Sequence, residues 1–537
     1  MSKSKRTQDP GRPAPSGKKA GESTIAESSN AAKSSKTPAA ATPAADRGDE
    51  GYAKALEPRH IRMIAIGGSI GTGLFLGTGG RLAEGGPGLM IAYAICGVFA
   101  FLMVRALGEL AIRRPSSGAF VSYAREFLGE KGAYFTGWMY YIVWVTVLMA
   151  DSTASALYLQ YWPLFQGVPQ WLLAFCVLAI VFAINMLSVK LFGEAEFWFS
   201  AIKVLMIILF IVLGLGAAFT GAHLGQYTAG IHNIADNGGM FPQGLGVVLT
   251  LTLGVVYAFG GTEMVGVASG EAKDAQKVLP KAINSMIVRI FVFYVGSVAV
   301  MTLVMPYTAY SANESPFVTF FAALGVPYAG DIIEAVVLIA AMSALNSGLY
   351  ASGRTLRSLA LAGSGPKVAR RLNSHKVPSG AIPLTMLVAM IGVVLNAVVP
   401  ERAFSIVMNL AGIGVASVWC IIMVIHLAYL RHIKATGEKR PAYRLPGAPV
   451  TDWLTLVFFL VVVVSNFFSE EGRQTIAVFA AVCVALVIGW FFVRGRIKAT
   501  MLDNMLDIND DALGVPDEER AVESPSTGDD ERTPLIR

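Results

Sequence analysis

Two glycine-rich stretches interrupt long apolar segments of this chain. The first reads Gly-Gly-Ser-Ile-Gly-Thr-Gly from Gly67 to Gly73, and the second reads Gly-Gly-Thr-Glu-Met-Val-Gly from Gly260 to Gly266. Glycine inside a helix costs up to about 1 kcal/mol relative to alanine, so each stretch predicts a helix break. Backbone groups freed inside a membrane must be satisfied by protein or by a water-filled cavity. A matched pair of breaks therefore predicts a binding site at membrane depth.

The composition supports the membrane setting. The 537 residues are 54% hydrophobic and 15% charged, whereas a soluble domain carries about 25% charged residues. Twelve apolar segments are each long enough to cross a bilayer. They lie at roughly 61–82, 88–111, 133–160, 169–188, 195–219, 243–269, 281–305, 329–360, 381–399, 403–429, 452–468 and 474–493. We expect an all-α integral membrane protein with twelve transmembrane helices.

The two breaks occupy the first and sixth of these segments, so each begins a block of five. Because five is odd, the second block must be inverted relative to the first. This arrangement predicts a five-plus-five inverted repeat, the design of many secondary transporters. Repeat one covers about 61–219 and repeat two about 243–429, and two extra helices follow at about 452–493.

The two ends of the chain are polar. Residues 1–55 are rich in Ser, Ala, Pro, Lys and Thr, and residues 500–537 are acidic, so we expect two disordered tails around a membrane domain at 56–499. Lys and Arg concentrate in the loops on the side of the tails, for example at 367–376 and 431–444. The positive-inside rule then predicts that both termini are cytoplasmic in a multi-pass protein of the bacterial plasma membrane. These loops explain the net charge of +6, and we expect no nucleic acid partner.

The polarity of the first break predicts its ligand. A half-helix that starts there presents the free N–H groups of Gly71, Thr72 and Gly73, which suit a carboxylate. Free carbonyls near Ser69 and at 257–260 suit an ammonium group. Together these groups predict recognition of an α-amino acid. The alternative is that the glycines serve only close helix packing.

Three side chains flank the second break, beside Gly260. Glu263 is an ionisable residue inside an apolar segment, which is expensive and usually functional. It is a candidate to carry a proton, to hold the unwound segment or to read a substrate amine, and a structural helix cap is the alternative. Tyr257 and Phe259 are candidates to close over a substrate, and ordinary packing is the alternative for each.

Lys203 is the one lysine within the fifth segment. It lies two turns beyond Glu196, so its ammonium has two possible places. It either snorkels toward the cytoplasm or docks against the broken backbone of the first segment, where a buried lysine can bind and release a proton. We favour the second possibility and name Lys203 and Glu263 as the candidates for proton coupling.

Four further polar residues have simpler interpretations. Asn346 is expected near the cavity, and Asp151 toward the outer end of its segment. Arg105 and Glu109, one helical turn apart, are expected to form a structural ion pair. We find no catalytic constellation, phosphate loop or metal cluster, so we expect no enzyme, no metal and no cofactor beyond a proton gradient.

Several stretches of the chain are similar to those of a known family. They are Leu56-Glu57-Pro58-Arg59-His60-Ile61, Ala106-Leu107-Gly108-Glu109-Leu110, Arg114-Pro115-Ser116-Ser117-Gly118-Ala119-Phe120 and Phe259-Gly260-Gly261-Thr262-Glu263. The chain resembles the amino acid transporter family of the amino acid–polyamine–organocation superfamily over about residues 50–495. Within it, stretches such as Gly137-Trp138-Met139-Tyr140 and Phe192-Gly193-Glu194-Ala195-Glu196-Phe197-Trp198 are most similar to actinobacterial L-asparagine permeases.

The resemblance implies a leucine-transporter-type fold and roles for the candidate residues. It implies carboxylate donors at Thr72 and Gly73, an amine-binding carbonyl at Ser69, and gate or site contacts at Tyr257 and Phe259. It also implies an acidic position at Glu263 and, as in proton-coupled relatives, Lys203 in place of sodium.

The implied function is proton-coupled import of an α-amino acid, with L-asparagine as the expected substrate and protons and lipid as partners. Transport of γ-aminobutyrate or another neutral amino acid, amino acid exchange, and a non-transporting sensor are the alternatives. No oligomeric state is predicted.

Overall fold

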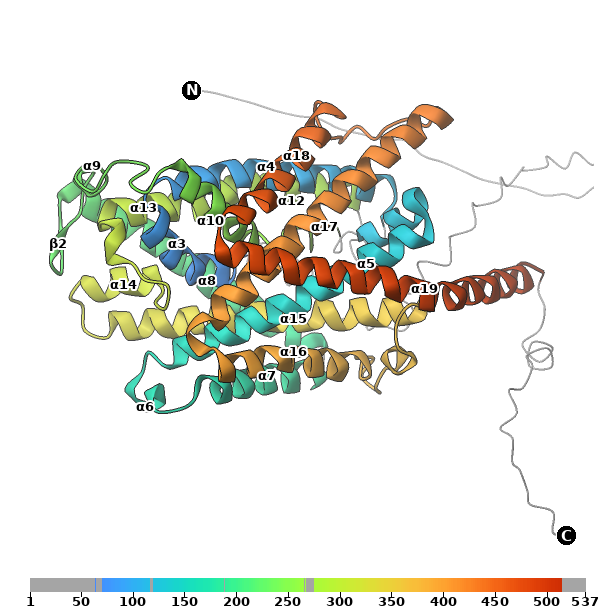
Figure 1. Ribbon diagram of the computed structural model, residues 1–537, viewed down its shortest axis with the longest axis horizontal. Coiled ribbons are helices and arrows are strands. Elements are labelled where there is room, and N and C mark those ends of the chain that lie inside the picture. Colours follow the sequence, from blue (N-terminus) through green and yellow to red (C-terminus); the bar gives the residue numbers. More distant parts are fainter. Residues whose placement is uncertain are drawn as a thin grey trace, which may run out of the picture. The chain divides into compact units, whose positions relative to one another are not determined.

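The structure of the chain is a computed structural model that is almost entirely helical (Figure 1). It describes Met63 and residues 70–115, 119–187, 189–264, 266 and 275–513. The helices are α2 (Thr72–Phe75), α3 (Gly77–Gly85), α4 (Leu89–Arg113), α5 (Ala119–Leu159), α6 (Pro163–Gln166), α7 (Gln170–Leu187), α8 (Val189–Thr220), α9 (His232–Ala235), α10 (Leu245–Ala258), α12 (Ala275–Arg289), α13 (Gly296–Val304), α14 (Pro316–Ala323), α15 (Ala329–Leu361), α16 (Ala381–Val398), α17 (Pro400–Thr436), α18 (Val450–Ser465) and α19 (Glu470–Leu513).

Ten helical segments of the described residues are long and apolar enough to cross a membrane, so the chain is an all-α, multi-pass membrane protein. They are α4, α5, α7, α8, α12 with α13, α15, α16, α17, α18 and α19. The two other predicted segments are those with the glycine breaks. One is represented by the short helices α2 and α3, and the other by the 14-residue helix α10.

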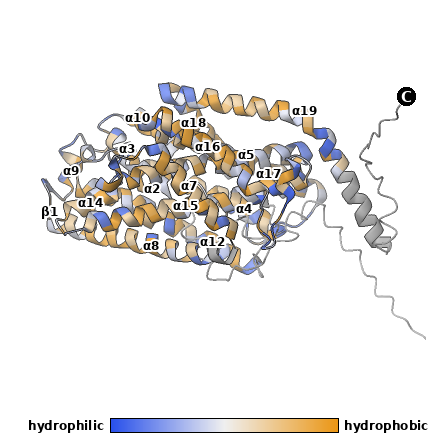
Figure 2. Cartoon of the chain, turned by 90° about the horizontal axis from the view of Figure 1, so that it is seen from below, coloured by the Kyte–Doolittle hydropathy of each residue, from blue (hydrophilic) through white to orange (hydrophobic). Residues whose placement is uncertain are grey.

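Three long helices form the centre of the bundle. The helices α15 and α17 both pack along α5, and these three are largely buried, whereas α19 is exposed along most of its length. Figure 2 shows apolar residues along the outer helices α8 and α19 and hydrophilic residues toward helix ends. Apolar outer faces are what a lipid environment requires, because lipid does not hydrogen-bond polar side chains.

Both predicted breaks lie beside the central helices. The helix α10 ends at Ala258, and the chain then turns through Gly261, whose φ of 91° is strained for residues other than glycine. The helix α2 starts after Gly71, which has an extended backbone. A Cβ on Gly73 would lie 2.6 Å from the Cα of Ala258, so the two broken segments touch at this point.

Three features differ from the sequence-based expectation. Helix α5 starts at Ala119 rather than near 133, because a kink at Gly129, with φ of 76°, joins a preceding helix to the apolar segment. A short antiparallel hairpin of β1 (His223–Leu224) and β2 (Tyr227–Thr228) occupies the loop after α8.

The third difference concerns the C-terminal tail. It was expected to be disordered from residue 500, but α19 continues to Leu513. Apolar residues recur there at helical spacing, as Met501, Leu502, Met505 and Leu506 illustrate, which favours helix over a disordered chain. The expected disorder of residues 1–55 and 514–537 concerns segments outside the described residues.

Candidate functional site

A small pocket lies between the two broken segments. Six predicted site residues line it, namely Gly71, Thr72, Gly73, Tyr257, Gly260 and Glu263. The other walls come from α5, α15 and α17. The cavity measures about 40 Å³, room for roughly three water molecules and too little for an amino acid. A molecule of the size of an amino acid could enter only if the lining segments moved apart.

A polar link joins the two broken segments to α5. The hydroxyl of Thr72 donates to Oδ1 of Asp151 over 2.6 Å and lies 2.9 Å from the hydroxyl of Tyr257. The other carboxylate oxygen of Asp151 is buried and has no hydrogen-bond partner within the part of the chain that the structure describes. Because an ammonium group binds such an oxygen well, the pocket contains a second candidate acceptor for a substrate amine.

Asp151 was not among the predicted site residues, and it was expected toward the outer end of its segment. It lines the pocket and is 1% exposed. Its position as a lone carboxylate in an apolar segment was the available signal, since such residues usually face a cavity. Trp144 was missed as well. It lines the same pocket from the same face of α5, two turns before Asp151, and its indole N–H has no partner among the described residues.

The residues predicted to bind the substrate carboxylate lie at the start of α2. Thr72 and Gly73 are the first two residues of this helix, and N–H groups in that position have no acceptor within the helix. Gly260 also lines the pocket, and a Cβ there would lie 3.0 Å from the carbonyl oxygen of Tyr257. Ser69, with its predicted amine-binding carbonyl, lies outside the described residues.

Glu263 braces the second break. Its side chain is buried, and its Oε2 accepts hydrogen bonds from the N–H of Gly261 over 3.1 Å and from the indole of Trp419 over 3.2 Å. These contacts tie the unwound turn to α17. Of the roles considered for Glu263, holding the unwound segment is the one with direct contacts.

The two aromatic candidates at the second break have different surroundings. Tyr257 faces the pocket, whereas Phe259 is fully buried and does not line it. The ring of Phe259 packs 4.6 Å from that of Tyr294 and 5.8 Å from that of Tyr93, centroid to centroid. Phe259 thus packs behind the pocket, and any contact with substrate would need a rearrangement.

Lys203 lies against the first break. Its ammonium is fully buried and donates to the carbonyl oxygen of Ile70 over 3.2 Å and to the hydroxyl of Ser343 over 3.0 Å. The snorkelling alternative is therefore wrong for this structure. Glu196, also fully buried, lies 3.9 Å from the ammonium, and the hydroxyl of Ser343 contacts both of its carboxylate oxygens. A buried carboxylate beside the lysine was not predicted.

The structure also decides the positions expected for Asn346 and for the pair of Arg105 and Glu109. Asn346 accepts a hydrogen bond from Asn185 of α7 over 2.7 Å and does not line the described pocket. The expected pair of Arg105 and Glu109 is wrong. Glu109 instead binds Arg440 through two hydrogen bonds of 2.8 Å.

Arg105 and Glu109 lie one turn apart on the same side of α4, but each finds partners on other segments, so tertiary contacts override the helical spacing that predicted their pair. Glu109 is fully buried and also lies 3.2 Å from a ring nitrogen of His426. Arg105 donates to the side-chain oxygen of Asn284 over 2.7 Å. Within the part of the chain that the structure describes, no group of three or more His, Cys, Asp or Glu is placed to hold a metal.

Comparison with known proteins identifies the family. Residues 60–501 match the family described as "Amino acid permease". The chain is 51% identical to the L-asparagine permease of Streptomyces coelicolor over 454 residues, which covers 84% of this chain and 93% of that protein. It is 52% identical to the L-asparagine permease of Escherichia coli over 450 residues, 84% of this chain and 90% of that protein. It is 47% identical to L-asparagine permease 1 of Mycobacterium tuberculosis over 458 residues, 85% of this chain and 94% of that protein. These relatives are permeases rather than enzymes, and this chain belongs to the amino acid permease family.

Proposed function

We propose that this protein imports L-asparagine together with a proton, as a secondary active permease with alternating access. The observation that carries the proposal is the pocket between the two broken segments, with Lys203 docked on the carbonyl of Ile70 behind it. A bound sodium ion keeps its charge, whereas a buried lysine can lose its charge by releasing a proton. The relatives named L-asparagine permease supply the choice of amino acid.

The substrate's α-amino acid group is proposed to bind at the pocket's polar ends. Its carboxylate would accept from the N–H groups of Thr72 and Gly73, and its ammonium would lie near Ser69 and the unpartnered oxygen of Asp151. The indole N–H of Trp144 is then available to the side-chain amide, which would favour asparagine over an apolar amino acid.

The architecture that fits this mechanism has twelve spans, with the glycine breaks in the two segments beyond the ten continuous helices. We propose the leucine-transporter-type five-plus-five inverted repeat, with both termini cytoplasmic and the protein in the bacterial plasma membrane. The pocket is too small for substrate as it stands, which supports an occluded conformation that opens alternately to the two sides.

Uptake by purified protein in liposomes tests the proposal. Radiolabelled L-asparagine should accumulate when the outside is acidic, and accumulation should collapse when an ionophore removes the proton gradient. Excess γ-aminobutyrate or neutral amino acids should compete less well than L-asparagine. Counterflow without response to the gradient would mean exchange, and binding without either flux would mean a sensor; each result would reject proton-coupled import.

A further inference from the structure

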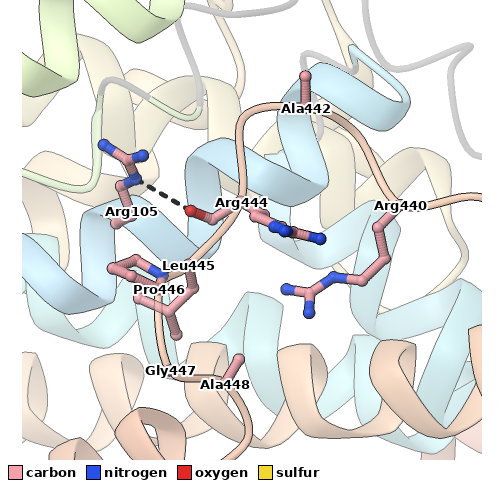
Figure 3. Close-up of a pocket in the computed structure, with 8 residues that line it drawn as sticks. All are labelled: Arg105, Arg440, Ala442, Arg444, Leu445, Pro446, Gly447 and Ala448. Carbon is pink, nitrogen blue, oxygen red and sulfur yellow. Dashed lines mark hydrogen bonds between the residues drawn. The ribbon is translucent and has the colours of Figure 1, made fainter.

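A second cavity, distinct from the substrate pocket, lies in the connection between α17 and α18. It measures about 500 Å³, and it is lined by Arg105 of α4 and by residues 440, 442 and 444–448. Figure 3 shows the guanidinium groups of Arg440 and Arg444 turned toward one another, with that of Arg105 across the loop, where it donates to the carbonyl oxygen of Arg444. Because like charges repel, such a cluster is stabilised by an anion between them.

The charge of this basic pocket is only partly neutralised. Arg440 binds the buried carboxylate of Glu109, which holds the pKa of Arg440 above its ordinary value. Arg105 has neutral acceptors, the side-chain oxygen of Asn284 and, over 3.2 Å, the carbonyl oxygen of Arg444. The side chain of Arg444 is exposed and has no partner among the described residues. Two of the three cations are thus left without a carboxylate.

Contacts of Glu109 and Tyr443 fix the walls of the basic pocket. Glu109 accepts the N–H of Leu445 over 2.7 Å in addition to Arg440, which anchors both ends of the loop segment that forms the wall. The guanidinium of Arg105 stacks on Tyr443, 3.9 Å from the ring centroid. These contacts orient the donors before a ligand arrives, and they reduce the entropy lost on binding.

The surroundings favour a lipid over a free anion. Helix α18 begins at Val450, directly after the pocket, and its first turns expose Trp453, Leu454 and Val457, each at least half accessible. Tryptophan is enriched where a protein meets lipid headgroups. A phosphate held by the arginines would place acyl chains along this apolar face.

We propose that the basic pocket between α17 and α18 binds the phosphate of an anionic phospholipid headgroup. Guanidinium groups suit this role because their planar fork donates two parallel hydrogen bonds to phosphate oxygens. Basic pockets at helix ends are a common means of lipid recognition. Lipid binding in this pocket does not depend on which amino acid is carried or on proton coupling.

Native mass spectrometry of the purified full-length protein tests it. Phosphatidylglycerol should bind about tenfold more tightly than phosphatidylcholine. Arg444→Ala should weaken phosphatidylglycerol about tenfold, the usual effect of losing one charge-assisted hydrogen bond. Arg444→Lys should restore only part of that loss, because lysine lacks the fork. Lys439→Ala is the matched control, since this exposed lysine lies in the same loop but does not line the pocket.

Three results would overturn the assignment. Equal weakening by Lys439→Ala and Arg444→Ala would mean diffuse attraction to a basic loop. No change on Arg444→Ala, with an unchanged melting temperature, would mean that lipid binds elsewhere. If inorganic phosphate binds as tightly as phosphatidylglycerol and displaces it completely, the pocket is a site for free phosphate rather than for a lipid.

Discussion

Lys203 is the residue on which the proposed coupling depends. Its ammonium touches the backbone at the first break and lies near the carboxylate of Glu196, with Ser343 bridging the two. A change in the charge of this pair would alter the contact with Ile70, and therefore the segment that leads into the substrate pocket. In the proposed mechanism, loss of a proton from the lysine would therefore act on the first break by direct contact.

Replacing this lysine tests the coupling. Lys203→Ala should reduce acid-driven asparagine accumulation to the level of protein-free liposomes, because no proton would remain to be exchanged at the break. Some substrate binding should persist, since Lys203 does not line the pocket. Uptake assays at two pH gradients, with binding measured separately, give the comparison. Gradient-driven uptake equal to that of the unaltered protein would rule out the proton role of Lys203.

A pair of substitutions at Thr72 separates the contribution of its hydroxyl from that of its N–H. Thr72→Val removes the hydroxyl bound to Asp151 and should weaken asparagine binding about tenfold, as expected for a lost charge-assisted bond. Thr72→Pro removes the N–H as well, and proline is tolerated at the first position of a helix. Isothermal titration should show a further large loss for proline. Equal affinities of the two variants would argue against a carboxylate at this N–H.

At the scale of elements, the site depends on how closely α2 approaches α10. Gly73 allows this approach, because its Cα lies where a side chain would strike Ala258. Gly73 therefore serves close helix packing, and this role is compatible with the ligand access proposed for the same stretch. Glu263 adds a second constraint, since it ties the unwound turn after α10 to Trp419 of α17.

Gly73→Ala tests this contact between elements. The added methyl group should push α2 from α10, destabilise the protein by about 1–3 kcal/mol and reduce uptake strongly. Gly246→Ala, in the partner helix α10, is the control for the substitution itself, because nothing lies within 4 Å of its added Cβ. Thermal unfolding in detergent, followed by uptake in liposomes, measures both effects. Equal unfolding temperatures and equal uptake for Gly73→Ala and Gly246→Ala would show that the close approach of α2 to α10 is not needed.

At the scale of the whole molecule, the proposed transport cycle would require the central helices to separate around a pocket of only about 40 Å³. Helix α5 contributes Asp151 and Trp144 to the pocket while packing against α15 and α17, so any opening of the pocket must change contacts among the largest buried helices. A ligand that bridges α2, α5 and α10 should accordingly stabilise the molecule as a unit.

This linkage predicts which compounds raise the melting temperature. L-asparagine at one hundred times its dissociation constant should stabilise the protein by about 2.7 kcal/mol. Succinamic acid, which lacks the α-amine, and 3-aminopropanamide, which lacks the α-carboxylate, should give much smaller shifts at the same concentration. Thermal shift assays in detergent provide the comparison. Similar shifts from all three compounds would mean that the α-amino acid group is not what the pocket recognises.

The sequence by itself determined the helical membrane class, the positions of the continuous spans and the two breaks. These properties are local: apolar length decides whether a segment crosses a bilayer, and clustered glycine decides where its helix stops. Lys203 was placed at the first break from the sequence as well, although its neighbour Glu196 was not assigned a role there.

Only the tertiary structure decided which side chains meet. Asp151 bonds to Thr72 from 79 residues away, and Glu109 pairs with Arg440, 331 residues distant, rather than with Arg105 one turn away. Such contacts depend on the rotation and register with which long helices pack. Hydrophobic composition leaves these quantities open, because several rotations of an apolar helix bury it equally well.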